Sequence, residues 1–179
     1  MSDWPNAMGG LPSSAGRAVY GTQSQLLGAS RAQTASVAWP SANLAIFVPV
    51  LLGERCIAYK MVVGAGSTAA GNFDVGIYDS GGNRLVSSGA TAKGASVEHV
   101  ADITDTVLGP GLYYLAMAAD GTNNYSMVNP SGTSPIPLQK ARLYGTLEAA
   151  SSYTLPSTAT MVARTTAPVP LIAVLTRGF

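Results

Sequence analysis

The stretch Asn72-Phe73-Asp74-Val75-Gly76-Ile77-Tyr78-Asp79 alternates between apolar and more polar side chains. Successive side chains of a β-strand point to opposite faces of the sheet, so this period of two predicts a strand. The residues expected to face a core are Phe73, Val75 and Ile77, and those expected to face solvent are Asn72, Asp74 and Tyr78. Residues 79–83 read Asp-Ser-Gly-Gly-Asn, which favours a tight turn, and residues 84–88 return as the partner strand. The stretch therefore predicts a β-hairpin.

The rest of the chain from residue 37 onward follows the same pattern of short strands and turns. Apolar or alternating segments bounded by turn residues predict further strands at 45–52, 55–63, 97–104, 112–118, 125–128 and 169–176. The alternation in 55–63 places one set of side chains on a common face, namely Ile57, Tyr59, Met61 and Val63. Residues 64–71 and 120–121 are expected to form hairpin loops, residues 108–111 a tight turn, and residues 138–147 a short helix.

This arrangement of elements determines the expected fold class. About eight short strands separated by turns, without alternating strands and helices, indicate an all-β chain rather than a parallel α/β sheet. We expect a jelly-roll-like β-sandwich over residues 37–179, with at most one short helix. The chain has 179 residues, which is enough for one ordinary domain.

Residues 1–36 differ from the rest of the chain because they show no period of two or of 3.6. They are rich in Gly, Ser, Ala and Gln, with isolated apolar anchors. Such a composition is typical of an extended arm, and few anchors serve so long a segment. The arm could pack on the chain's own domain, but we expect it to make assembly contacts with a neighbouring subunit, through Trp4, Leu11, Tyr20, Leu26 and Leu27.

The charge of the chain is low and balanced. Ten Lys and Arg residues and nine Asp and Glu residues give a net charge of +1, and charged residues make up 11% of the chain. Ordinary domains contain roughly 25% charged residues. The basic residues are dispersed, which argues against nucleic-acid binding. The low charge indicates a surface that meets other protein; the alternative is a protein rich in small residues with a Ser/Thr surface.

Residues capable of catalysis are few. The single histidine, His99, lies in the predicted strand 97–104 and is expected to face solvent, and no Gly-x-Ser-x-Gly elbow occurs. Asp74 and Asp102 could be neighbours on one sheet face, but most other acids lie in turn-like positions. We therefore expect no enzyme activity.

Metal, cofactor and membrane signals are also weak. The single cysteine, Cys56, lies in an apolar run and is expected to be buried, so it offers neither a disulfide nor a zinc site. Asp79 opens a sequence that resembles a calcium loop, but Ala90 stands where the loop needs an acid. The glycines of 64–71 lack the Lys that a phosphate loop needs. We expect no metal, no cofactor, no secretory signal and no membrane-spanning helix.

Three stretches of the chain resemble a group of small virion proteins of tailed bacteriophages. The stretches are 39–50, 71–79 with 82–87, and 108–116. Members of the group are jelly-roll head decoration proteins, head fibres and tail or baseplate accessories. The resemblance implies a virion protein made in the host cytoplasm, but it carries no catalytic residue. It implies as partners other copies of the chain, with a trimer as one arrangement, and the major capsid protein or tail proteins of the particle.

Together these observations predict a non-enzymatic virion structural protein. We expect a capsid decoration (cement) or head-fibre subunit that docks through its N-terminal arm. The alternative is a tail-fibre or baseplate module that binds host surface glycan, which would need exposed aromatic side chains. The candidates for glycan-facing residues are Tyr78, Tyr113 and Tyr125. A polysaccharide-degrading enzyme is disfavoured by the placement of the carboxylates.

Overall fold

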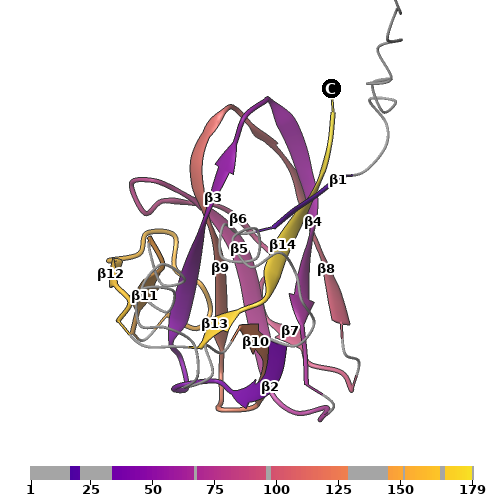
Figure 1. Ribbon diagram of the computed structural model, residues 1–179, viewed down its shortest axis with the longest axis vertical. Coiled ribbons are helices and arrows are strands. Elements are labelled where there is room, and N and C mark those ends of the chain that lie inside the picture. Colours follow the sequence, from indigo (N-terminus) through magenta and orange to yellow (C-terminus); the bar gives the residue numbers. More distant parts are fainter. Residues whose placement is uncertain are drawn as a thin grey trace, which may run out of the picture.

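The described strands build an all-β sandwich, which confirms the predicted fold class (Figure 1). The computed structural model describes residues 17–20, 34–66, 68–95, 98–128, 145–150, 152–165 and 168–178. Within these residues every strand pairing is antiparallel and no helix occurs. The jelly-roll connectivity stays a prediction.

The larger layer is a seven-stranded sheet. Its strands follow the order β12-β11-β3-β9-β5-β6, and β7 pairs with β5 beside this path. The bounds are β3 (Ala45–Leu52), β5 (Asn72–Asp79), β6 (Arg84–Ser87), β7 (Thr91–Ala92), β9 (Gly111–Ala119), β11 (Leu147–Ala149) and β12 (Val162–Ala163). The predicted hairpin of 72–88 is confirmed as β5 and β6, paired from Gly76 opposite Ser87 to Tyr78 opposite Arg84.

Two smaller sheets complete the sandwich. A four-stranded sheet has the order β1-β14-β4-β8, and a three-stranded sheet has the order β13-β10-β2. Their bounds are β1 (Arg17–Tyr20), β4 (Cys56–Gly64), β8 (Glu98–Leu108), β14 (Ile172–Arg177), β2 (Thr34–Ala38), β10 (Asn124–Val128) and β13 (Val169–Pro170). In Figure 1 the three-stranded sheet lies at the lower end of the sandwich, and β8, of the four-stranded sheet, lies at the right-hand side of the sandwich.

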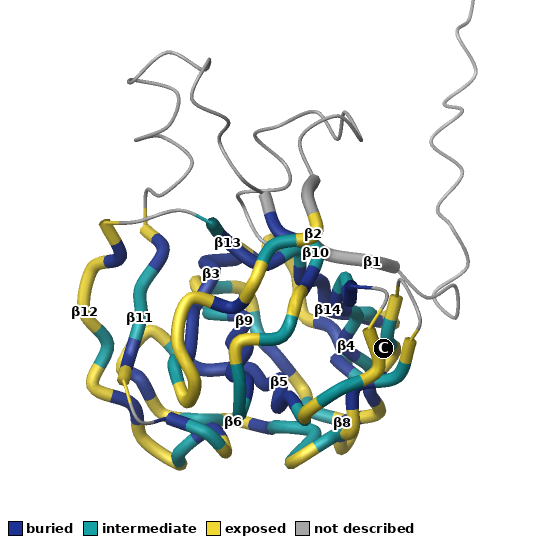
Figure 2. Tube along the Cα trace, turned by 90° about the horizontal axis from the view of Figure 1, so that it is seen from below, coloured by how far each residue is buried: buried dark blue, intermediate teal, exposed yellow. Residues whose placement is uncertain are grey.

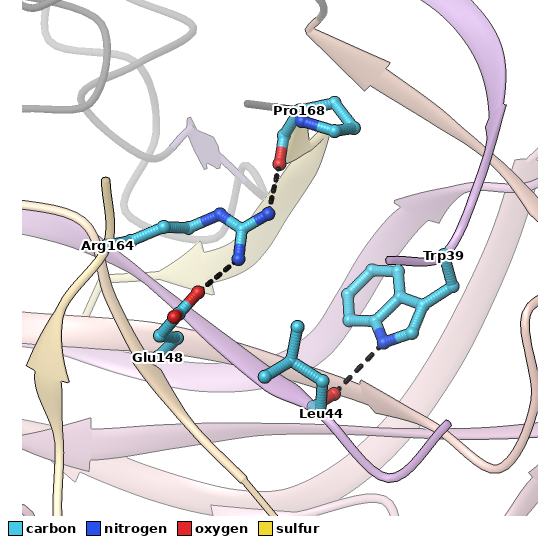
Figure 3. Close-up of polar contacts among 5 residues, drawn as sticks. All are labelled: Trp39, Leu44, Glu148, Arg164 and Pro168. Carbon is cyan, nitrogen blue, oxygen red and sulfur yellow. Dashed lines mark hydrogen bonds and ion pairs between the residues drawn. The ribbon is translucent and has the colours of Figure 1, made fainter. Parts of the chain in front are cut away.

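The main core lies between the layers, where dark blue residues fill the interior in Figure 2. The predicted inward residues of β5 are fully buried: Phe73, Val75 and Ile77. They meet apolar residues of the facing sheet, such as Met61 and Val174. Trp39, which follows β2, is fully buried in this core. Its ring lies 5.5 Å from that of Tyr125, and its Nε1 donates a 3.0 Å hydrogen bond to the Leu44 carbonyl (Figure 3).

The outer face of the seven-stranded sheet is also buried, so the expectation that Asp74 and Tyr78 face solvent is wrong. Both residues have 0% exposure. Residues 152–161, here called the cover segment, lie over this face and enclose a second apolar cluster. The Leu155 N–H donates to Asp74 Oδ2 at 3.0 Å, and the Tyr78 hydroxyl donates to the Pro156 carbonyl at 2.5 Å.

Small residues make room for the cover segment. Three alanines of the sheet, Ala45, Ala116 and Ala118, are fully buried in the second cluster. A Cβ atom at Gly76 would lie 3.0 Å from Leu155 Cδ1 and 2.7 Å from the Val86 carbonyl oxygen. The glycine therefore allows Leu155 to pack directly on β5. Two-sided burial also explains part of the low charge of the chain, because sheet positions that would otherwise meet water need apolar residues.

A β-bulge in β4 overturns the predicted common face of Ile57, Tyr59, Met61 and Val63. The pairing with β8 shifts between Ala58 and Lys60, and the pairing with β14 shifts opposite the same place. Relative to β14, Tyr59 is an extra residue of β4, because Ala58 and Lys60 pair with the consecutive residues Thr176 and Leu175, and this extra residue reverses the alternation. Met61 and Val63 are buried, whereas Ile57 and Tyr59 are only half-buried and the inward positions before the bulge belong to Cys56 and Ala58.

Other local predictions have mixed outcomes. The turn at 79–83 is confirmed, since Asp79 Oδ1 accepts hydrogen bonds of 2.9 Å from the N–H groups of Gly81 and Asn83. Residues 64–71 and 120–121 are not hairpin loops, because the strands on either side of each lie in different sheets. Most of the predicted helix 138–147 lies outside the described residues, and its last residues form a turn at Gly145 and the start of β11.

We expect Ile77→Ala to lower the free energy of unfolding by about 2–5 kcal/mol, because it truncates a fully buried side chain between two packed sheets. Chemical denaturation measures this loss. Leu85→Ala, at a side chain that is 41% exposed on the neighbouring strand, is the control and should change stability by less than about 1 kcal/mol. A similar loss for both variants would contradict the inward orientation of Ile77.

Candidate assembly surface

The tyrosines predicted to face a glycan are not exposed. Tyr78 and Tyr125 have 0% exposure, the first beneath the cover segment and the second against Trp39. Burial raises the pKa of the Tyr78 hydroxyl to about 12, and it also raises the pKa of the Tyr125 hydroxyl. Tyr113 is half-buried, packs against the main core, and donates a 3.2 Å hydrogen bond to the Gly109 carbonyl. The expectation of exposure is therefore wrong for Tyr78 and Tyr125.

The described residues do not include four of the five side chains expected to make assembly contacts, namely Trp4, Leu11, Leu26 and Leu27. Tyr20 ends β1, where it is paired with Ala173 of β14. Thr34–Ala38 forms β2 and pairs with β10. The predicted arm, residues 1–36, therefore contains β1 and the first part of β2, and both are strands of the chain's own sheets.

The few candidate catalytic groups are separated. His99 is half-buried rather than facing solvent; its ring lies 5.6 Å from that of Phe73, and its Nε2 lies 3.2 Å from the Gly94 carbonyl oxygen. Asp74 and Asp102 belong to different sheets, so the idea that they share a face is wrong. Cys56 is buried as predicted. Among the described residues, no three His, Cys, Asp or Glu side chains gather as a metal site would require.

In the part of the chain that the structure describes, three charged side chains are buried, and each is tied to backbone groups. Asp74 accepts from Leu155 N–H and from Ser88 Oγ, the latter at 3.3 Å, and burial raises the pKa of its carboxyl group. The Lys93 ammonium donates to the carbonyls of Gly66 and Thr68 and lies 5.3 Å from the centre of the Tyr125 ring. Burial lowers the pKa of Lys93.

Arg164 is the third buried charge (Figure 3). Its Nη1 forms an ion pair with Glu148 of β11, and its Nη2 donates a 3.1 Å hydrogen bond to the Pro168 carbonyl. Burial lowers the pKa of the guanidinium, and the neighbouring Glu148 carboxylate opposes this shift. The guanidinium therefore joins β11 of the large sheet to the segment that leads into β13. These three groups hold elements together inside the molecule.

The most distinctive exposed surface is the outer side of β4, β8 and the end of β14. We call it the outer β4–β8 face and define it by Ile57, Tyr59, Lys60, Val62, Val100, Asp102, Asp105, Val107 and Arg177. Val100 and Val107 are 52% and 51% exposed, although both lie in a strand. β8 is an edge strand of the four-stranded sheet, and Figure 2 shows it mostly in the colours of exposed and intermediate residues.

The sheet registers place the residues of this face in rows. Val62 lies opposite Val100, Lys60 opposite Asp102, and Ile57 opposite Val107. Lys60 Nζ lies 3.1 Å from Asp102 Oδ1. Arg177 reaches from β14 across the ring of Tyr59, at 5.5 Å from its centre, and pairs with Asp105. The face thus has apolar residues at both ends and two ion pairs with an aromatic ring between them.

This face was not predicted from the sequence, and its components carry little local signal. The outward positions of β8 change from even to odd numbers along the strand, because three residues, 103–105, lie opposite Tyr59 alone. Inward Ala101 and Ile103 therefore precede inward Leu108. One signal in the sequence is the spacing of Val100 and Val107. A strict period of two would place them on opposite faces of the strand, so their common exposure requires a bulge between them.

Comparisons with known proteins find no similar protein. No family model matches the chain, and neither a curated protein nor a solved structure matches it. Among the described residues, no helix is long and apolar enough to cross a membrane.

The buried carboxyl group of Asp74 gives the stability of the protein a defined pH dependence. Because its pKa is raised above 3.8, the folded state holds this proton more tightly than the unfolded state. Stability therefore falls as the pH rises from about 3.8 through the raised pKa, and it stays lower above that window. Asp74→Asn removes this penalty and keeps an acceptor for Leu155 N–H. We expect the stability of the variant relative to the parent to increase across the window.

Asp79→Asn is the matched control for this titration. Hydrogen bonds from Asn83 lower the pKa of Asp79, so its contribution is present above pH 3.8 and is lost as the pH falls below it. Thermal denaturation of the three proteins from pH 3 to 7 gives both profiles. A constant difference between Asp74→Asn and the parent over that range would contradict the raised pKa.

Proposed function

We propose that this chain is a non-enzymatic structural subunit of a tailed-phage particle, most simply a capsid decoration or head-fibre protein. The observation that carries the proposal is the outer β4–β8 face. Val100 and Val107 are each more than half exposed, and the four charged groups of the face are paired with one another. An exposed apolar surface with balanced charge is typical of sites where protein meets protein.

The fold and the sequence resemblance add support. The three stretches that resemble tailed-phage virion proteins contribute to strands of the sandwich, namely β3, β5, β6 and β9. The burial of charged groups in structural contacts is consistent with a scaffold. The alternative function, binding of host glycan, receives less support because Tyr78 and Tyr125 are buried.

Labelling of intact particles with gold-conjugated antibody against the chain tests the proposal. We expect label over the head of the particle, as a decoration or head-fibre subunit requires. Label at the tail tip would instead favour the tail module, and glycan binding would then be measured directly. Particles without label, although infected cells contain the protein, would overturn the proposal.

A truncation separates the role of the arm from the stability of the sandwich. Removal of residues 1–36 would take away β1 and most of β2, so it tests folding as well as docking. Removal of residues 1–16 takes away no described strand. We expect the 17–179 protein to keep the thermal unfolding midpoint of the full chain but to be absent from particles made with it. Normal incorporation would contradict docking through the arm.

A further inference from the structure

We propose that the outer β4–β8 face binds the same face of a second copy of this chain across a two-fold axis. In such a contact, if residue i of one copy meets residue j of the other, then j also meets i. A face can form it only when it is complementary to itself. The outer β4–β8 face meets this condition in both its charges and its apolar residues.

The charges of the face lie in two stripes. The carboxylates of Asp102 and Asp105 both belong to the edge strand β8, whereas the cations Lys60 and Arg177 belong to the strands inside it, β4 and β14. A second copy turned by 180° can place its acidic stripe on the basic stripe of the first. Each cation then faces a carboxylate of the partner, and each carboxylate faces a cation.

The exposure of these groups leaves them able to make such contacts. Within the ion pairs, the side chains of Lys60 and Asp102 are 40% and 83% exposed, and those of Arg177 and Asp105 are 45% and 54% exposed. Val100 and Val107 lie on either side of the acidic pair along β8. A contact that covers the whole face, from one end to the other, also buries both valines, which supplies apolar area.

The geometry points to packing of faces rather than pairing of β8 edges. The β8 edge carries the bulge opposite Tyr59 and two exposed aspartates. Bulges and charged side chains on an edge strand hinder the addition of another strand. The same bulge turns Asp105 and Val107 onto the outer side, so it disfavours edge pairing and completes the face.

Charge exchange between copies gives a specific test. In the dimer, Lys60 of one copy faces Asp102 of the other, so Lys60→Asp and Asp102→Lys each place like charges together. Sedimentation velocity of the full chain over a range of concentrations measures the dimer. We expect the parent to dimerise and each variant alone to dimerise more weakly, by roughly tenfold or more. An equal mixture of the two variants should restore dimerisation, because each 60–102 contact in the mixed dimer again joins opposite charges.

Apolar variants test the same face independently of its ion pairs. Val100→Glu and Val107→Glu should also weaken the dimer, since each buries a charge in the contact. Leu51→Glu is the matched control, because Leu51 is 68% exposed on β3 of the other sheet and lies outside the face. It should leave the dimer unchanged. Thermal unfolding of each variant checks that the fold is retained.

Several outcomes would overturn the inference. They are a parent chain that stays monomeric at high concentration, a trimer, a dimer insensitive to the Val100 and Val107 variants, or a mixture that fails to restore dimerisation. The inference goes beyond the proposed function and does not depend on it. A dimer with no label on particles would remove the virion role alone, and labelled particles with a monomeric chain would remove this inference alone.

Discussion

Burial of the seven-stranded sheet on both faces is the constraint on which the rest of the structure depends. One face packs against the four-stranded sheet with large side chains such as Phe73 and Met117, and the other packs beneath the cover segment with small ones such as Ala116. The central strands are therefore buried at consecutive positions, not at alternate ones. Apolar burial of this extent is the main favourable contribution to folding, and it leaves few sheet positions for charged residues.

Two-sided burial also requires hydrogen-bond partners for the cover segment. Much of this segment is not regular strand, so its backbone groups lack the partners that a sheet would supply. Asp74, Tyr78 and Arg84 supply them, by binding the backbone of Leu155 and Pro156. A buried carboxylate is tolerated here because it accepts two hydrogen bonds, from Leu155 N–H and Ser88 Oγ. These three polar side chains of the hairpin thus hold the cover segment against the sheet.

The four-stranded sheet solves a different problem, because in the described structure its outer face is only partly covered. The bulge opposite Tyr59 turns two carboxylates and two valines of β8 to the same side, next to the cations of β4 and β14. The two sheets therefore differ in kind: one is enclosed by the chain itself, and the other offers a surface with paired charges and exposed valines. This difference is why an assembly role is a more natural proposal than chemistry at a pocket.

The sequence by itself determined many of the local elements: the β5–β6 hairpin, the turn at 79–83, the approximate positions of β3, β4, β8, β9, β10 and β14, and the buried cysteine. These depend on side-chain alternation and on turn residues, which act within a few positions. Only the tertiary structure decided which faces are covered. Asp74 is buried because Leu155, 81 residues away, binds it, and no local pattern encodes that contact. Likewise, the segments 64–71 and 120–121 join strands of different sheets, and the alternation of inward and outward side chains in β4 reverses at Tyr59. Pairing between distant strands decides both features.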